Sequence, residues 1–82
     1  MVATADIDAR MRRSIGTEFE IEESLMTDDA TLGDALGIDS LDMVDLTVVI
    51  ESEFGVKLSR EELVKARTFG DLKNLIVNRI DG

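Results

Sequence analysis

Residues 40–54 read SLDMVDLTVVIESEF and carry the clearest structural pattern in the chain. Two apolar stripes recur at helical spacing, Leu41, Val44 and Val48 in one and Leu46, Ile50 and Phe54 in the other. The β-branched run over 47–50 would suit a strand, but it lies inside a pattern whose period is near 3.6 residues. We therefore expect one amphipathic helix over about residues 40–54.

Three further helices are expected around this one. Ile7, Met11 and Ile15 recur every four residues, which predicts a helix over about 4–15 that Gly16 helps to end. Gly55 is in the position that glycine favours after a helix, so it should close the helix of residues 40–54. Downstream, the sequence contains two start signals for helices.

Those signals are Ser59, with Glu62 three residues later, and Thr68. The first pair forms a capping box and predicts a short helix to about residue 66. Thr68 begins the last helix, in which apolar residues keep helical spacing to the end. Between the first two helices lie more than twenty residues of mixed acidic and isolated apolar character, which predict a long ordered loop of the kind that often has a function. The expected fold is all-α: a four-helix bundle with a short third helix, as a single domain over residues 1–82.

Composition excludes several classes of function. The chain has 82 residues, of which 44% are apolar and 4% aromatic, and it contains no Cys and no His. Without them, Ser-His and Cys-His catalysis, thiolate chemistry and nearly all zinc sites are excluded, so we expect no catalytic residues and no metal site. No apolar run is longer than three residues, as at 48–50. A membrane span or secretory signal is therefore not expected, and the predicted location is cytoplasmic.

Charge is distributed unevenly along the chain. Between Ser14 and Val56 there are 12 acidic residues and no Lys or Arg, whereas the whole chain has a formal net charge of −9. Such a surface is a poor match for nucleic acid or anionic lipid and a good one for basic protein surfaces. Charge alone is equally compatible with a role in solubility. The acids do not follow the spacing of a helix-loop-helix calcium loop.

The segment Asp39-Ser40-Leu41-Asp42 follows Leu36-Gly37-Ile38 and starts the central helix. Its simplest interpretation is structural, because Asp39 or Ser40 would cap the helix and acids favour a helix N-terminus. A hydroxyl at that position is also accessible to a modifying enzyme. The neighbouring acids would oppose a phosphate on Ser40, which suggests that they serve a partner protein.

This segment, together with Val44-Asp45-Leu46 and Glu51-Ser52-Glu53-Phe54, closely resembles the acyl carrier proteins, whose signature is Asp-Ser-Leu after a Leu-Gly turn. The resemblance covers essentially the whole chain. It implies that Ser40 receives a 4'-phosphopantetheine arm from coenzyme A, attached by a separate magnesium-dependent phosphopantetheinyl transferase. The terminal thiol of the arm would hold acyl groups as thioesters, which supplies the sulfur that the sequence lacks.

The resemblance also assigns expected roles to two sets of residues. The helix positions that meet basic patches on transferases and ketosynthase-type enzymes correspond to Asp39, Leu41, Asp42, Val44, Asp45, Val48 and Glu51. The positions that form the core or receive the acyl chain correspond to Leu46, Ile50, Phe54 and Ala66.

Four positions depart from the usual pattern of fatty-acid carriers. Leu32 replaces a Phe, and Ala35, Ser52 and Arg60 stand where acids are common. The expected function is therefore a free-standing, monomeric carrier, general or specialised, for fatty acid, polyketide or related lipid synthesis. The alternative is a small acidic interaction module that carries no prosthetic group.

Overall fold

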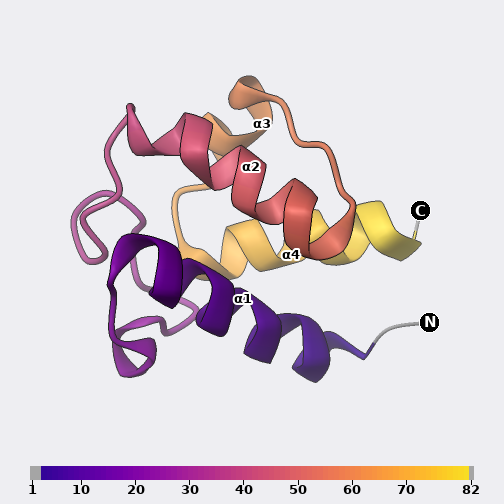
Figure 1. Ribbon diagram of the computed structural model, residues 1–82, viewed down its shortest axis with the longest axis horizontal. Coiled ribbons are helices and arrows are strands. Elements are labelled where there is room, and N and C mark those ends of the chain that lie inside the picture. The colour runs from indigo at the N-terminus through magenta and orange to yellow at the C-terminus, as the bar shows by residue number, and fades with distance from the viewer. Residues whose placement is uncertain (1–2, 82) are drawn as a thin grey trace.

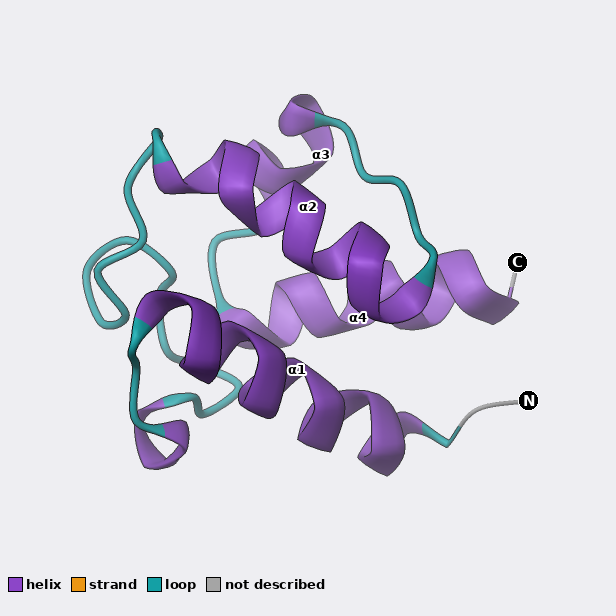
Figure 2. Ribbon diagram, viewed as in Figure 1, coloured by secondary structure: helices purple, strands orange, loops and turns teal. Residues whose placement is uncertain are grey.

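The computed structural model describes residues 3–81, and it confirms the all-α class. Four α-helices and one short 3₁₀ helix follow each other in the order α1 (Thr4–Phe19), η1 (Glu23–Leu25), α2 (Asp42–Phe54), α3 (Arg60–Lys65) and α4 (Phe69–Asp81) (Figures 1 and 2). Helix α1 runs antiparallel to α2 and α4, and α3 lies beside α2 (Figure 1). Both ends of the described chain therefore lie at one end of the molecule, and the start of α2 lies at the other (Figure 1).

The core is apolar throughout the described residues, with no buried polar or charged side chain. Each long helix contributes one face to it. Burying one large apolar side chain in this core stabilises the fold by about 1.5–3 kcal/mol, before the entropy cost of ordering the chain is subtracted. The principal contributors are Ile7, Met11 and Ile15 from α1, Leu46 and Ile50 from α2, and Phe69, Leu72 and Ile76 from α4.

The first helix is longer than expected. Gly16 does not end it, because α1 continues to Phe19 and stops at Glu20, whose φ of 55° is left-handed. Gly16 is instead a site of close approach: a Cβ there would lie 2.9 Å from the backbone oxygen of Ile21. The chain turns back over the helix at this point, with the Ile21 N–H donating to the Gly16 carbonyl at 2.9 Å. The glycine is needed for packing rather than for termination.

The other helix boundaries follow their predicted caps. Gly55 ends α2 with a φ of 69°. Ser59 and Glu62 form the reciprocal capping box that starts α3. The Glu62 carboxylate accepts a hydrogen bond from the Ser59 N–H, and this bond lowers the pKa of Glu62. Thr68 Oγ1 accepts the N–H of Asp71 at the start of α4. The β-branched part of α2 is helical, as predicted.

The loop over residues 20–41 is held against the connection between α3 and α4. Backbone N–H groups of Leu32, Phe69 and Gly70 donate across this contact to carbonyls of Arg67, Ala30 and Asp28, each at 2.9 Å. Gly70 fits closely, because a Cβ on it would lie 2.8 Å from the Asp28 oxygen.

An ion-pair cluster adds to this attachment. Lys73 Nζ lies 3.2 Å from Oδ1 of Asp8 in α1 and 2.5 Å from Oδ1 of Asp28 in the loop. The hydrogen bond that Lys73 donates to Asp28 contributes most to the raised pKa of Lys73. The ammonium group thus joins α1, the loop and α4. Within the described residues, no helix is long and apolar enough to cross a bilayer.

Candidate functional site

Ser40 lies in the last turn before α2, which begins two residues later than expected. Asp39 forms the cap: its Oδ1 accepts the N–H groups of Leu41 and Asp42, both at 3.0 Å. Asp42 Oδ2 in turn accepts the Asp39 N–H at 3.2 Å. Of the two capping candidates, the structure therefore selects Asp39 and leaves the Ser40 hydroxyl without a hydrogen bond among residues 3–81.

The backbone before Ser40 is fixed. Gly37 adopts a φ of 71°, which glycine tolerates and other residues rarely do. Ile38, the next residue, is buried, and its N–H donates to the Leu32 carbonyl at 2.8 Å. The Ser40 side chain is exposed between this anchor and the Asp39 cap. The serine is thus presented to solvent on a rigid support.

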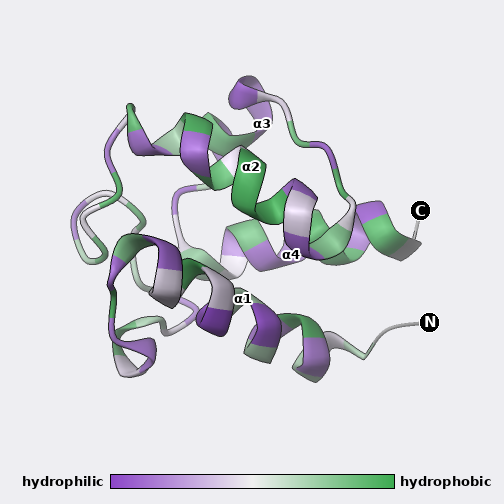
Figure 3. Cartoon of the chain, viewed as in Figure 1, coloured by the Kyte–Doolittle hydropathy of each residue, from purple (hydrophilic) through white to green (hydrophobic). Residues whose placement is uncertain are grey.

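The outer side of α2 is apolar and open. The stripe of Leu41, Val44 and Val48 is 83%, 59% and 58% exposed. Hydrophobic residues consequently occur on the outer as well as the inner side of α2 (Figure 3). Val64 of α3, 64% exposed, was not predicted. The available signal was its place next to Leu63, since so short a helix buries only one residue there.

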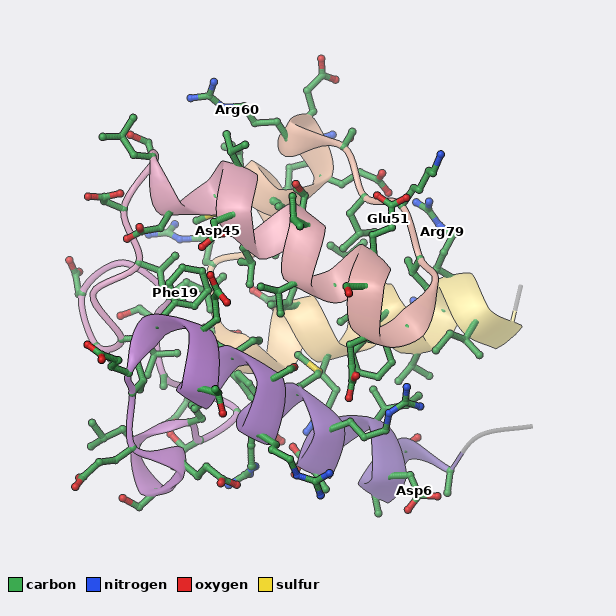
Figure 4. The ribbon with its side chains drawn as sticks, viewed as in Figure 1. Asp6, Phe19, Asp45, Glu51, Arg60 and Arg79 are labelled. Carbon is green, nitrogen blue, oxygen red and sulfur yellow. The ribbon has the colours of Figure 1, made fainter. Side chains whose placement is uncertain are left out.

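The spacings of 3 and 6 residues among Asp42, Asp45 and Glu51 suggest one acidic face on the helix, and this expectation is wrong for Asp45 and Glu51. At 3.6 residues per turn they lie about 120° apart, on either side of the apolar stripe. Asp45 lines a groove of about 480 Å³ between α1 and α2, and a hydrogen bond between Asp45 and Glu18 raises the pKa of Glu18. Glu51 lies at the other edge, 3.9 Å from Lys57 (Figure 4). Asp39 and Asp42 act mainly on the backbone, as the cap.

A groove of about 310 Å³ opens beside Ser40. Its walls come from the loop, the first turn of α2 and the end of α3, and it combines apolar side chains with two acids and one base. The lining residues are Thr31, Leu32, Gly33, Asp34, Ile38, Asp39, Ser40, Met43, Val64, Ala66 and Arg67.

Of the residues expected to form the core or receive an acyl chain, only Ala66 lines this groove. Leu46 and Ile50 are at most 1% exposed and belong to the closed core. Phe54 lies at the far end of α2, where the Arg10 guanidinium stacks 4.7 Å from the ring centroid. These three residues hold α2 in place rather than line an open cavity.

Arg60 interrupts the negative surface. It is the first residue of α3 and is exposed, and it makes no ion pair with any residue in 3–81. Figure 4 shows its side chain projecting outward from the start of α3, beyond α2. Its charge is therefore available to a partner that covers the outer side of these two helices.

Comparisons with known proteins agree on one family. Residues 9–76 match the family model described as a phosphopantetheine attachment site. The chain is 39% identical over 80 residues to an acyl carrier protein of Thermotoga maritima, an alignment that covers 98% of this chain and 99% of that one. It is 38% identical over 72 residues to an acyl carrier protein of Petrotoga mobilis, covering 88% and 85% of the two chains. Among solved structures, an acyl carrier protein from Enterococcus faecalis superimposes with a TM-score of 0.77 at 27% identity, over 95% of this chain and 99% of that chain.

Proposed function

This chain belongs to the acyl carrier proteins, which carry a covalent 4'-phosphopantetheine and are not catalysts, and we propose that Ser40 is its attachment residue. The observation that supports this most directly is the free hydroxyl of Ser40. It is exposed, it lies at the start of a helix, and the capping that a serine commonly provides is done by Asp39 instead.

The residues around Ser40 fit the group. The hydroxyl is accessible to a transferase, and the groove beside it has room for part of a flexible arm. When bound, the arm supplies a thiol that holds acyl groups as thioesters. The chain itself holds the attachment point rigid, through Ile38 and the Asp39 cap, while the rest of the arm stays free to reach a partner.

We further propose that the outer side of α2 and α3 docks the transferase and the acyl-transfer and ketosynthase-type enzymes. An exposed apolar centre with separated acids at its edges suits a partner with an apolar patch surrounded by basic residues. The pathways that this proposal covers are fatty acid, polyketide or related lipid synthesis. Arg60, exposed beside the apolar centre, favours a specialised carrier over a general one, because it would repel the basic groups that α2 attracts.

Intact-mass measurement tests the attachment. Incubation with coenzyme A and a broad-specificity phosphopantetheinyl transferase should add one phosphopantetheine to the wild type and none to Ser40→Ala. Ser52→Ala is the matched control: Ser52 is an exposed serine on α2, and the variant that lacks it should still gain one phosphopantetheine, on Ser40. A label on Ser40→Ala would overturn the site. An unmodified wild type would instead support the interaction module without a prosthetic group.

A further inference from the structure

Among residues 3–81, Arg67 is the only basic one that lines the groove beside Ser40. Its side chain is exposed, and its guanidinium makes no ion pair or hydrogen bond with any residue in the described range. Several other basic side chains of the chain have acidic partners, as Lys73 does with Asp8 and Asp28. The positive charge of Arg67 is therefore uncommitted at the edge of the site.

The backbone of Arg67 is fixed on both sides. Its carbonyl accepts the N–H of Leu32 at 2.9 Å, and its own N–H donates to Asp71 Oδ2 at 3.1 Å. Leu32 is also the residue whose carbonyl holds Ile38, two positions before Ser40. The base of the arginine side chain and the attachment serine are thus tied to the same segment of the loop.

The charges around Ser40 suggest a role for Arg67. A phosphodiester on Ser40 would bring a negative charge next to Asp39, Asp42 and Asp45, which repel it. In the groove, the Asp39 carboxylate is occupied by two backbone N–H groups, and Asp34 adds a second negative charge. Arg67 is the one group there that can neutralise a phosphate, and its guanidinium is charged at every physiological pH and donates in pairs to phosphate oxygens.

We propose that Arg67 binds the phosphodiester of the arm on Ser40 and so favours the arm lying in the groove over its extension into solvent. The inference rests on the proposed attachment at Ser40. Arg67 is a positioning residue in this proposal, since it touches the phosphate and not the reacting thiol. Neither of the neighbouring bases is a substitute: Lys65 lines a separate cavity between α3 and α4, and Arg60 does not line the groove beside Ser40.

The test uses the phosphorus of the modified protein. We expect the ³¹P resonance of the modified wild type to differ from that of Arg67→Ala, and raised salt to move the wild-type signal toward the variant's. Arg67→Lys should give an intermediate shift, because an ammonium keeps the charge but loses the paired geometry. Arg60→Ala is the matched control, an exposed arginine outside the groove, and its ³¹P signal should equal that of the wild type.

A second measurement reads the arginine itself. The ¹⁵Nε–H signal of Arg67 should move when the unmodified protein is converted to the modified form, whereas that of Arg60 should not. The thiol of the arm should also react with a disulfide reagent about two to five times faster in Arg67→Ala, the range expected for loss of an exposed charge pair. Wild type and Arg67→Ala with identical ³¹P signals would overturn this inference while an intact-mass shift on Ser40 still supported the attachment. Absence of that mass shift would overturn the proposed function instead.

Discussion

Side chains are buried in the loop that leads to Ser40 but exposed on the outer side of α2 that follows it. In the loop, Met26, Leu32 and Ile38 are buried, and Asp28 is paired with Lys73. On α2, Leu41, Val44 and Val48 stay exposed. The loop has no regular secondary structure beyond one short turn, yet its residues are committed to the fold. The regular helix is the element that leaves part of its apolar surface exposed.

Truncation of one apolar residue in each region should show the largest difference. Leu32→Ala removes a side chain that is 1% exposed and should lower the free energy of unfolding by about 2–5 kcal/mol. Val48→Ala should change it by no more than about 0.5 kcal/mol, since the side chain is exposed and alanine favours the helix. Urea unfolding of both variants measures the contrast. Comparable losses would show that the loop is not a committed part of the core.

A glycine exchange tests how closely the loop is attached. Gly70→Ala places a Cβ 2.8 Å from the Asp28 oxygen and should cost about 1–3 kcal/mol, although alanine normally improves a helix. Gly33→Ala is the control within the loop, because its Cβ would meet nothing closer than 3.9 Å. Thermal unfolding should separate the two variants. A Gly70→Ala protein as stable as the wild type would mean that the loop moves away from α4 without cost.

Charge reversal tests whether the outer side of α2 docks partner enzymes. Asp45→Lys should slow modification by the transferase about threefold to tenfold at low salt, through slower association, and the defect should shrink as salt rises. Asp6→Lys makes the same change of charge at the start of α1, away from α2, and should have little effect (Figure 4). Kinetics over an ionic-strength series distinguish them. Equal rates for Asp45→Lys and the wild type at low salt would remove Asp45 from the docking surface.

The smallest expected effect is on pH dependence. The hydrogen bond with Asp45, and then repulsion between the two carboxylates, raises the pKa of Glu18 above its usual 4.5. The folded state therefore binds this proton more tightly than the unfolded state, so the contribution to stability is full below pH 4.5 and is lost as pH rises through the raised pKa. Asp45→Asn should make the melting temperature fall less over that interval.

Two neighbours need attention in this measurement. Arg13 and Glu53 line the same groove and are unchanged in the variant. Glu62 acts in the opposite direction, since its lowered pKa favours folding above its usual 4.5, and it too is common to both proteins. The difference between wild type and Asp45→Asn thus isolates the Glu18 pair. Asp6→Asn, which removes one charge elsewhere, should leave the slope as it is in the wild type.

The helices could be predicted because their signals are local. The Ser59 and Glu62 box, Thr68 and Gly55 each act within four residues, and each boundary they predicted is confirmed. Gly16 failed as a signal because its role depends on Ile21 folding back over it. That contact is a property of the loop's path, which no periodicity in the sequence describes.

The site was predicted in outline but not in arrangement. Motif and resemblance pointed to Ser40, whose accessibility agrees with the proposal, and the exposed stripe on α2 follows from its spacing. The separation of Asp45 and Glu51 follows from helix periodicity, whereas the contact of Asp45 with Glu18 required the packing of α2 against α1. Arg67 was not anticipated, because it reaches the neighbourhood of Ser40 only through contacts between segments about 30 residues apart.

Both ends of the described chain lie opposite the start of α2, across a molecule whose longest dimension is 31 Å. A flexible linker fused to either end would therefore be attached on the side of the molecule opposite Ser40. If the protein were tethered in this way to a surface or to a partner enzyme, Ser40 would still face away from the point of attachment. It could reach any position within a sphere whose radius is the linker length plus the width of the fold. Immobilised assays and engineered enzyme fusions can use either terminus without masking the outer side of α2.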